Sequence, residues 1–203
     1  MIAISSLIER VDELGIFLMP AKPGYVSSPT QSFREAALRE PAPRVEKNGK
    51  RVIGFSEMKE KYLEHRYPLI MLDRITDYRE GEYIEAIKCV TGNSPELVGH
   101  FPKRAIMPAT QVVQGFAQLA IIFFKLSMGQ ITDDEMTLIT SVKFRFLAPI
   151  YPGDTLEMAM RPKKLEEAIG IFVGDAAVGD RSVVKGGLTL AKTRVARFAD
   201  APW

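Results

Sequence analysis

Residues 108–128 read PATQVVQGFAQLAIIFFKLSM, and this stretch decides the fold. We expect Pro108 to be the first residue of a helix, because a proline loses no hydrogen bond at that position. About twenty residues follow without another proline, and the helix they form is apolar on nearly every face. Such a helix has to be wrapped by other elements.

The segments around this helix supply the wrapping. Four stretches rich in β-branched and aromatic residues follow it, separated by Pro-Gly-Asp, Glu-Glu and Gly-Asp turns: 137–147, 155–161, 169–178 and 182–195. Before the helix, residues 69–77 and 82–90 are predicted to form a hairpin. One hydrophobic helix among meandering strands predicts an α+β domain, in which a curved antiparallel sheet surrounds a long central helix.

The N-terminal quarter of the chain has a different pattern. Its 203 residues are enough for one domain with an appendage. Capping-box patterns at Ser6 and Ser32 start two short predicted helices, and prolines interrupt the chain around them. We therefore interpret residues 1–55 as a helical appendage and Pro-rich linker, and residues 56–203 as the domain. Within the domain, a short helix is expected from Ser56, as N-cap, to Tyr67, where Pro68 stops it.

Composition excludes several classes of protein. Apolar residues make up 46% and charged residues 26%, as in a globular protein. The formal net charge of +2 is too small for a nucleic-acid-binding face. The most apolar run, 112–124, is too short to cross about 30 Å of hydrocarbon as a helix, so we expect no membrane span. No export signal is visible at the N-terminus, and we expect a cytoplasmic protein.

Few residues in the sequence have the chemistry of a metal or redox site. The single cysteine, Cys89, is expected to be a small buried hydrophobic residue. With it the chain has two histidines, His65 and His100, and none of the three stands at a ligand spacing. We therefore expect no metal and no redox cofactor.

His100 has the most suggestive surroundings. It lies in a Gly-His-Phe-Pro loop just before the central helix, whose first backbone N–H groups, near Ala109 and Thr110, can polarise a carbonyl oxygen. A base beside such donors suits chemistry at the carbon next to a thioester carbonyl. On spacing alone, a structural loop histidine is an equally open interpretation.

Three glutamines, Gln111, Gln114 and Gln118, fall on one side of the central helix. Buried amides need hydrogen-bond partners, so Gln111 and Gln118 are also interpreted as a polar seam against another strand or subunit.

Several motifs resemble those of one enzyme family. Residues 65–74, HRYPLIMLDR, resemble the His-Arg-Tyr-Pro-Phe-Leu-Leu-Val-Asp-Arg opening of the FabZ-type 3-hydroxyacyl-acyl carrier protein dehydratases. Residues 99–102 and 106–108 resemble their Gly-His-Phe-Pro and Ile-Phe-Pro, and residues 116–118 resemble the Met-Ala-Gln of their central helix. Residues 145–154 resemble a stretch that ends in Pro-Gly-Asp. The resemblance covers about residues 56–196.

The resemblance implies a hotdog fold, a homodimer or a larger assembly of dimers, and an acyl-phosphopantetheine tunnel at the subunit boundary. It implies that His100 is the base, that Ala109 supplies the oxyanion N–H, and that the partner's central helix contributes a carboxylate at position 114. It also implies acyl carrier protein as partner, and no cofactor beyond the phosphopantetheine of the substrate. Further residues follow from the matching motifs: Thr110, Gln118, Tyr67 and Phe101 for substrate binding, and Lys103, Arg104, Lys143 and Arg145 for carrier-protein contact.

This chain has Gln114 where the family has its acid. A primary amide cannot supply a proton to a departing hydroxyl, and loss of a positioned acid typically costs about 10²–10⁴-fold in rate. Glu96 and Asp73 are possible substitutes, although a solvated Glu96 is the simpler interpretation.

Three functions therefore remain open, while thioester hydrolysis, which is common among hotdog proteins, fits these dehydratase-like motifs less well. The first is dehydration of 3-hydroxyacyl carrier-protein thioesters in fatty acid or polyketide biosynthesis, with altered activity. The second is double-bond migration in an enoyl thioester. The third is a non-catalytic acyl-binding or scaffolding role, in which the chain pairs as a hotdog heterodimer with a protein that brings the carboxylate.

Overall fold

The computed structural model describes residues 50–198, which lie within one compact unit. The helices expected after Ser6 and Ser32 lie outside these residues. The central helix, α4, runs from Ala109 to Met128, so the prediction of a twenty-residue helix is confirmed. Pro108 is its N-cap, with φ −62° and ψ 133°, and not its first helical residue as expected, because its backbone is still extended.

The length argument against a membrane span is wrong, because α4 as a whole is long and apolar enough to cross a bilayer. The position of the helix in the fold accounts for its apolar character instead. Of its most apolar stretch, 61% is buried inside the structure, where side chains such as Phe116 and Phe123 pack against the sheet.

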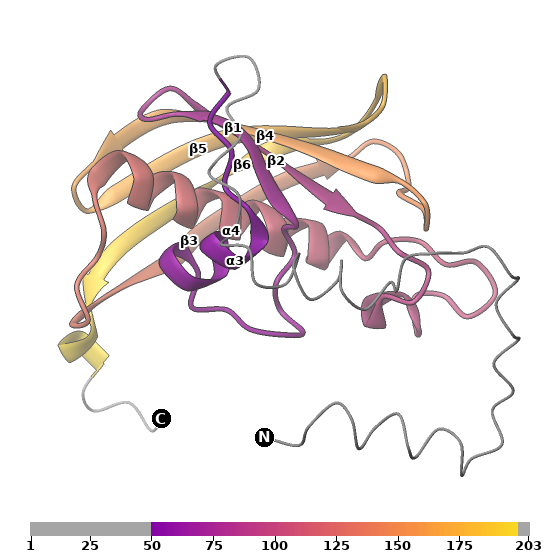
Figure 1. Cartoon of the computed structure of the whole chain (residues 1–203), viewed down its shortest axis with the longest axis horizontal. Coiled ribbons are helices and arrows are strands. Elements are labelled where there is room, and N and C mark those ends of the chain that lie inside the picture. Colours follow the sequence, from indigo (N-terminus) through magenta and orange to yellow (C-terminus); the bar gives the residue numbers. More distant parts are fainter. Residues whose placement is uncertain (1–49, 199–203) are drawn as a thin grey trace, which may run out of the picture. The chain divides into compact units, whose positions relative to one another are not determined.

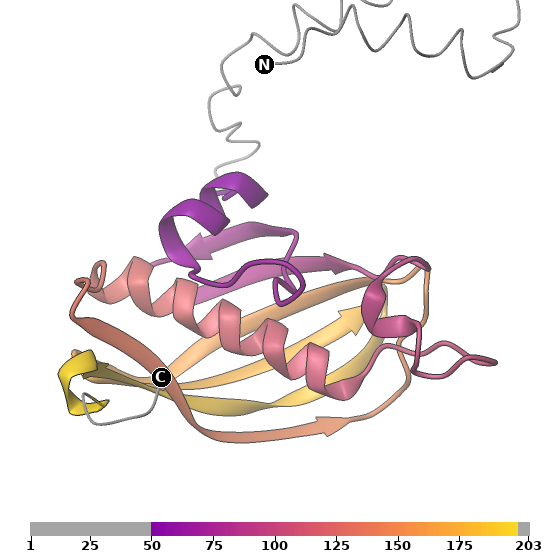
Figure 2. The same ribbon diagram turned by 90° about the horizontal axis from the view of Figure 1, so that it is seen from below.

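A six-stranded antiparallel sheet curves around α4, in the order β1-β2-β4-β5-β6-β3 (Figures 1 and 2). The arrangement is the hotdog fold: a long helix packed against a curved sheet. The strands are β1 Arg74–Arg79, β2 Tyr83–Cys89, β3 Glu135–Phe146, β4 Thr155–Glu166, β5 Ile169–Val178 and β6 Arg181–Arg194. Short helices lie at α3 Phe55–Glu57, η1 Met58–Tyr62, η2 Pro95–Leu97 and η3 Val195–Phe198.

Two expected boundaries before the sheet are wrong. The helix expected from Ser56 to Tyr67 starts at Phe55, with Gly54 as its N-cap, and its π-helical continuation ends at Tyr62, because Leu63 has an extended backbone. The first predicted strand covers 69–77, but β1 begins only at Arg74. Residues 69–72 are apolar, but Leu69 and Met71 form backbone hydrogen bonds with Gln118 of α4 and not with a strand. Pairing with the hairpin starts at Asp73, whose N–H donates to the carbonyl of Ile87.

The inward face of β2 agrees with its alternating pattern. Ile84 and Ala86 point into the core and are buried. Cys89 has the opposite phase and is exposed, so its expected burial is wrong. Just before α3, Ile53 is fully buried and forms an isolated bridge with Ile75 of β1.

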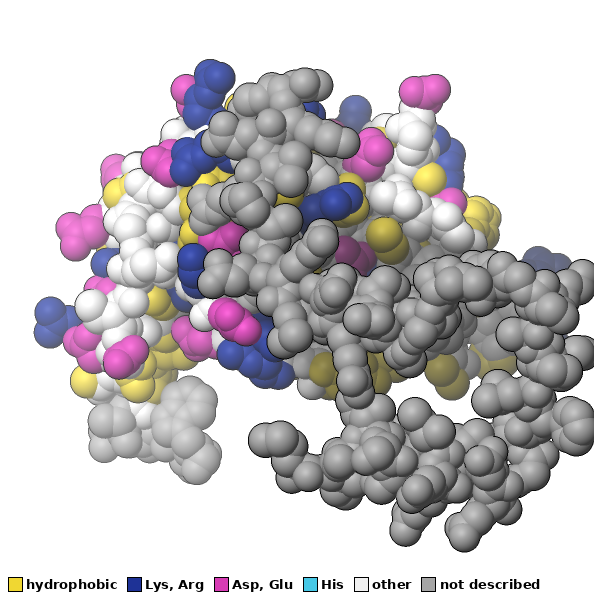
Figure 3. Space-filling view, in the orientation of Figure 1, with side chains coloured by type: hydrophobic (Ala, Val, Ile, Leu, Met, Phe, Trp, Pro, Cys, Tyr) yellow, Lys and Arg dark blue, Asp and Glu magenta, His cyan; other side chains and the backbone are white. Residues whose placement is uncertain are grey.

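Over the described part of the surface in view, basic and acidic side chains are interspersed (Figure 3). This mixture agrees with the near balance of charge in the sequence.

Candidate active site

The loop between η2 and α4 fixes the position of His100. The backbone N–H of His100 donates to the carbonyl of Leu97 at 3.3 Å, and the N–H of Ile106 donates to the carbonyl of His100 at 3.0 Å. The ring Nδ1 of His100 lies 3.1 Å from the carbonyl oxygen of Ile106. Since a carbonyl oxygen only accepts, Nδ1 carries the hydrogen of the neutral ring, and Nε2 keeps the lone pair of a base.

His100 faces a pocket of about 350 Å³ at the start of α4. The pocket brings His100 together with Ala109, as the sequence predicted. Its other lining residues are Ile106, Met107, Phe146, Leu147, Ala148, Pro149 and Ile150.

At the N-terminus of α4, the backbone N–H groups of Ala109 and Thr110 have no acceptor within the helix. Gln111 and Val112 donate to the carbonyl of Pro108 at 3.1 and 3.3 Å. The N–H groups of Ala109 and Thr110 therefore come before the first hydrogen bond of the helix, and both residues are exposed. A carbonyl oxygen in the pocket could accept from them.

The wall of residues 146–150 was not singled out from the sequence. Three hydrogen bonds hold it in position. Leu147 N–H donates to Val183 O at 2.8 Å, Met107 N–H donates to Ile150 O at 2.8 Å, and the Arg181 guanidinium donates to Pro149 O at 2.7 Å. Arg181 also pairs with Asp154 at 3.4 Å, and the intervening turn contains Gly153 at φ +97°. The available signal was the family-like stretch 145–154, which contains this wall.

The other predicted substrate-binding residues do not line the pocket of their own chain. Gln114 is partly exposed on α4, and Tyr67 is 82% exposed. Phe101 is exposed but stacks on the His100 ring, with 4.2 Å between ring centroids. These positions are compatible with the implied site, in which residue 114 comes from the partner subunit.

Gln118 has a structural role. Its side chain is fully buried, its Oε1 accepts from Met71 N–H at 2.9 Å, and its Nε2 donates to Leu69 O at 2.6 Å. The amide has hydrogen-bond partners, as a buried amide needs, but they lie in the segment before β1 and not in a strand or a second subunit. The amide therefore ties that segment to the central helix.

The predicted carrier-protein contacts fall into two groups. Lys103 and Arg104 are exposed on the His100 loop. Lys143 and Arg145, from β3, line a separate hollow of about 410 Å³ over β5 and β6. Two more basic side chains, Lys163 and Lys185, line the same hollow.

The two acids weighed as substitutes for the missing carboxylate do not line the His100 pocket. Asp73 accepts a hydrogen bond from Cys89 N–H at 2.5 Å and pairs with Lys88 at 3.7 Å. It therefore organises the β1–β2 hairpin. Glu96 lies in η2 and is partly exposed.

The sequence of this chain is similar to a protein family model and to known dehydratases. A family model described as a FabA-like domain matches residues 63–186. The coronafacic acid dehydratase of Pseudomonas savastanoi pv. glycinea is 41% identical over 140 residues, which are 68% of this chain and 84% of that protein. The 3-hydroxyacyl-[acyl-carrier-protein] dehydratase FabZ of Macrococcus caseolyticus is 37% identical over 132 residues, 64% of this chain and 88% of that protein.

Solved structures support the same fold at lower identity. The dehydratase heterocomplex ApeI:P from Xenorhabdus doucetiae matches with a TM-score of 0.56 and 15% identity, over 69% of this chain and 93% of that chain. The fluoroacetyl-CoA thioesterase FlK matches with a TM-score of 0.51 and 16% identity, over 61% and 93%. These two show the hotdog fold alone, but the family model and the dehydratase sequences are specific: the chain belongs to the FabA-like family of hotdog dehydratases.

Proposed function

We propose that this chain removes water from a 3-hydroxyacyl thioester carried on acyl carrier protein, or adds water in the reverse direction. The observation that carries the proposal is the hydrogen bond between His100 Nδ1 and Ile106 O, which leaves Nε2 as a base in a pocket shared with the start of α4. FabZ relatives are named as dehydratases of acyl carrier protein substrates, which supports this choice of substrate class.

In the proposed reaction, His100 Nε2 removes a proton from C2 of the acyl chain. The thioester oxygen gains negative charge and accepts hydrogen bonds from the N–H groups at Ala109 and Thr110. The C3–O bond then breaks, and the hydroxyl leaves with a proton as water. Because a glutamine has no proton to give, the imidazolium of His100 returns the proton to the leaving oxygen, while the amide of the partner subunit's Gln114 holds that oxygen by hydrogen bonds.

The decisive experiment follows the mass of the acyl chain. Purified protein is incubated with 3-hydroxyacyl and 2-enoyl carrier-protein substrates, and mass spectrometry records a loss or gain of one water. His100→Asn should abolish the change. No conversion at stoichiometric amounts of protein would refute the proposal.

Gln114 favours a second candidate function. A chain without its own acid suits a heterodimer in which a complete hotdog protein brings the carboxylate, and this chain binds or positions the acyl group. If the purified homodimer turns over substrate without a partner, this candidate is excluded. If activity appears only after the complete protein is added, the heterodimer is supported.

The same substitution keeps double-bond migration open as a neighbouring activity, because moving a proton between carbons requires a base but no departing hydroxyl. An enoyl substrate whose product absorbance shifts without a change in mass would identify it.

A further inference from the structure

A second polar cluster lies near the other end of α4. Lys125 belongs to the last turns of the helix and is only 7% exposed. Its Nζ lies 3.9 Å from the carboxylate of Glu64, whose side chain is 81% exposed. Charge-assisted hydrogen bonds are about 2.7–2.9 Å long, so this pair is loose. Burial is the main reason that the pKa of Lys125 lies below its usual value.

His65 completes the cluster. Its Nδ1 is buried and has no hydrogen-bond partner within residues 50–198. Burial lowers the pKa of this imidazole, Glu64 acts in the opposite direction, and the charge of Lys125 lowers it further. A buried polar atom without a partner is costly, and a ligand that hydrogen-bonds to it removes that cost.

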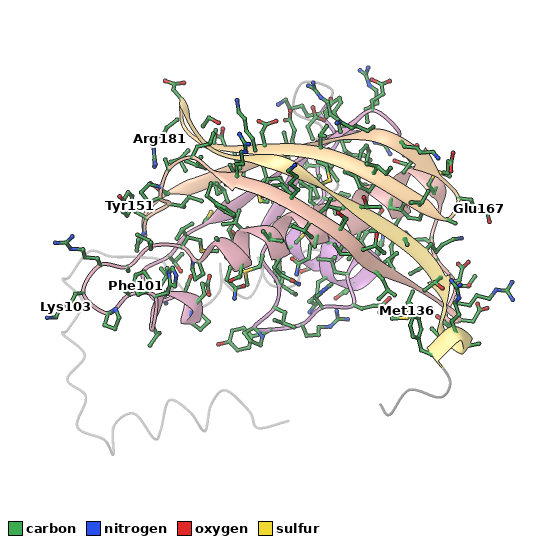
Figure 4. All side chains as sticks on the ribbon, turned by 180° about the vertical axis from the view of Figure 1, so that it is seen from behind. Phe101, Lys103, Met136, Tyr151, Glu167 and Arg181 are labelled. Carbon is green, nitrogen blue, oxygen red and sulfur yellow. The ribbon has the colours of Figure 1, made fainter. Side chains whose placement is uncertain are left out.

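These side chains border a pocket of about 320 Å³. Its lining residues are Tyr62, Glu64, His65, Ile121, Lys125, Met136 and Thr137. Seen from behind, Met136 lies at one end of the molecule, and Phe101 and Lys103 of the His100 loop lie at the other (Figure 4). The pocket is therefore distinct from the hollow that contains His100.

A row of residues on one face of α4, called the stripe below, runs from the His100 end of the helix toward the Lys125 pocket. Residues at steps of four, three, four and four share a helix face: Thr110, Gln114, Ala117, Ile121 and Lys125. The first four keep some exposure in the single chain, whereas Lys125 is buried. From Gln114 to Lys125 the helix rises about 16 Å. The stripe therefore leads from the residue proposed to hold the leaving hydroxyl to the polar pocket.

The chemistry of the pocket selects an acceptor with negative charge. An ammonium has three donors and no acceptor, and a neutral imidazole in its Nδ1–H tautomer adds one more donor. Glu64 leaves the ammonium poorly matched, because its carboxylate is largely in solvent. A carboxylate that enters the pocket along the stripe would reach Lys125 and His65 together.

On this basis, which rests on the proposed function, we propose that the acyl chain of the substrate carries a carboxylate at its far end, and that Lys125 and His65 bind this group. The inference extends the proposed dehydratase to a substrate class, the ω-carboxyacyl thioesters. The chain would therefore discriminate between substrates at a point remote from the bond that breaks.

The test uses acyl-pantetheine analogues with an amide in place of the thioester, so that binding is measured without turnover. Pairs of equal length end in a carboxylate or in a methyl group, and calorimetry gives their Kd values over a series of lengths. We expect the carboxylate-ended analogue to bind about tenfold more tightly at the best length, as one to two charged hydrogen bonds predict.

Variants separate the role of charge from that of packing. Lys125→Met keeps an apolar stem of similar size and should abolish the preference, while Lys61→Met removes an exposed lysine and should leave it unchanged. Glu64→Gln removes the competing carboxylate and should strengthen the preference. A preference that survives Lys125→Met, or that weakens in Glu64→Gln, would overturn the proposal, as would acetate that binds as tightly as the full analogue.

Failure of the carboxylate site can be distinguished from failure of the proposed dehydratase activity. Carboxylate preference without any turnover of the thioesters would leave the binding site standing and remove the enzyme. Turnover with equal affinity for both chain ends would leave the enzyme standing and remove the site.

Discussion

At the scale of single residues, His100 and Gln114 divide the work of an elimination unequally. An imidazole can accept a proton and donate it again, whereas a primary amide only donates and accepts hydrogen bonds. In the proposed reaction His100 is therefore the base, and the same imidazole also serves as the acid. A single residue that performs both steps is a slow arrangement compared with two positioned groups.

Gln114→Glu should increase the rate of enoyl product formation by about 10²-fold, because it places a proton donor at the position that the resemblance assigns to the partner's acid. Carrier-protein substrates and mass spectrometry provide the measurement. Gln111→Glu adds the same charge to the same helix less than one turn away and should have no such effect. An unchanged rate in Gln114→Glu would mean that position 114 does not face the departing hydroxyl.

His65 should make stability dependent on pH. Because burial depresses its pKa in the folded state below the ordinary 6.5, the unfolded chain binds more protons as the pH falls through 6.5 and below. Stability should therefore fall in this window; the charged groups that act on His65 are Glu64 and Lys125.

Urea unfolding at pH 7.5 and 5.5 measures this effect. Wild type should lose more stability between the two values than His65→Asn, which cannot become charged. Equal losses in the two proteins would contradict the assignment.

At the scale of elements, the contact between α4 and the sheet depends on small residues. Gly174 of β5 lies under Phe116 of α4, and a Cβ added there would lie 2.9 Å from both the Phe116 ring and the carbonyl oxygen of Ala159. Backbone on one side and a fully buried ring on the other leave little room for adjustment.

Gly174→Ala should therefore destabilise the fold by about 1–3 kcal/mol, which is the usual cost of overpacking. Chemical denaturation measures the change. Gly92→Ala is the matched control, because a Cβ there has nothing within 4 Å, and it should unfold at the same urea concentration as wild type.

The elements were predictable where local composition decides them. The central helix and the last four strands follow from an uninterrupted apolar run and from turn residues, and the structure reproduces them within a few residues except at the end of β4, which extends to Glu166. The segment 69–73 was assigned to a strand because four of its five residues are apolar. In the structure, the backbone of Met71 and of Leu69 bonds to Gln118. These partners are forty-seven and forty-nine positions apart in the sequence, so no local pattern reveals the contact.

At the scale of the whole molecule, the basic residues expected to contact a carrier protein lie in two separate regions of the surface. Lys103 and Arg104 belong to the loop that carries His100, whereas Lys143 and Arg145 line the hollow on the sheet. An acyl group has to be delivered to His100, so the loop pair is the better position for docking.

Arg104→Glu should weaken binding of an acidic carrier protein by about fivefold to tenfold at low salt, with a smaller effect at high salt. Surface plasmon resonance at two ionic strengths measures it. Lys164→Glu makes the same change in charge on β4 close to Glu167, which lies at the opposite end from Phe101 and Lys103 (Figure 4), and should not change affinity. Unchanged affinity in Arg104→Glu would remove that residue from the interface.

Like the fold, the candidate site was predictable where its residues are close in sequence and not where they are distant. His100 and Ala109 were predictable because they lie nine residues apart, in a loop and at the helix start that it leads into. The cluster of His65 and Lys125 was not, because it depends on two residues sixty positions apart in the sequence and on a buried environment that only the packed structure creates.

The double hydrogen bond of Gln118 has one more consequence, for hydrogen exchange. The Met71 amide lies outside every helix and strand, where exchange with deuterium is ordinarily fast. It is nevertheless held by a fully buried side chain of the central helix. We expect it to exchange as slowly as the amides in the middle of α4, so that a loop amide reports the opening of the entire domain.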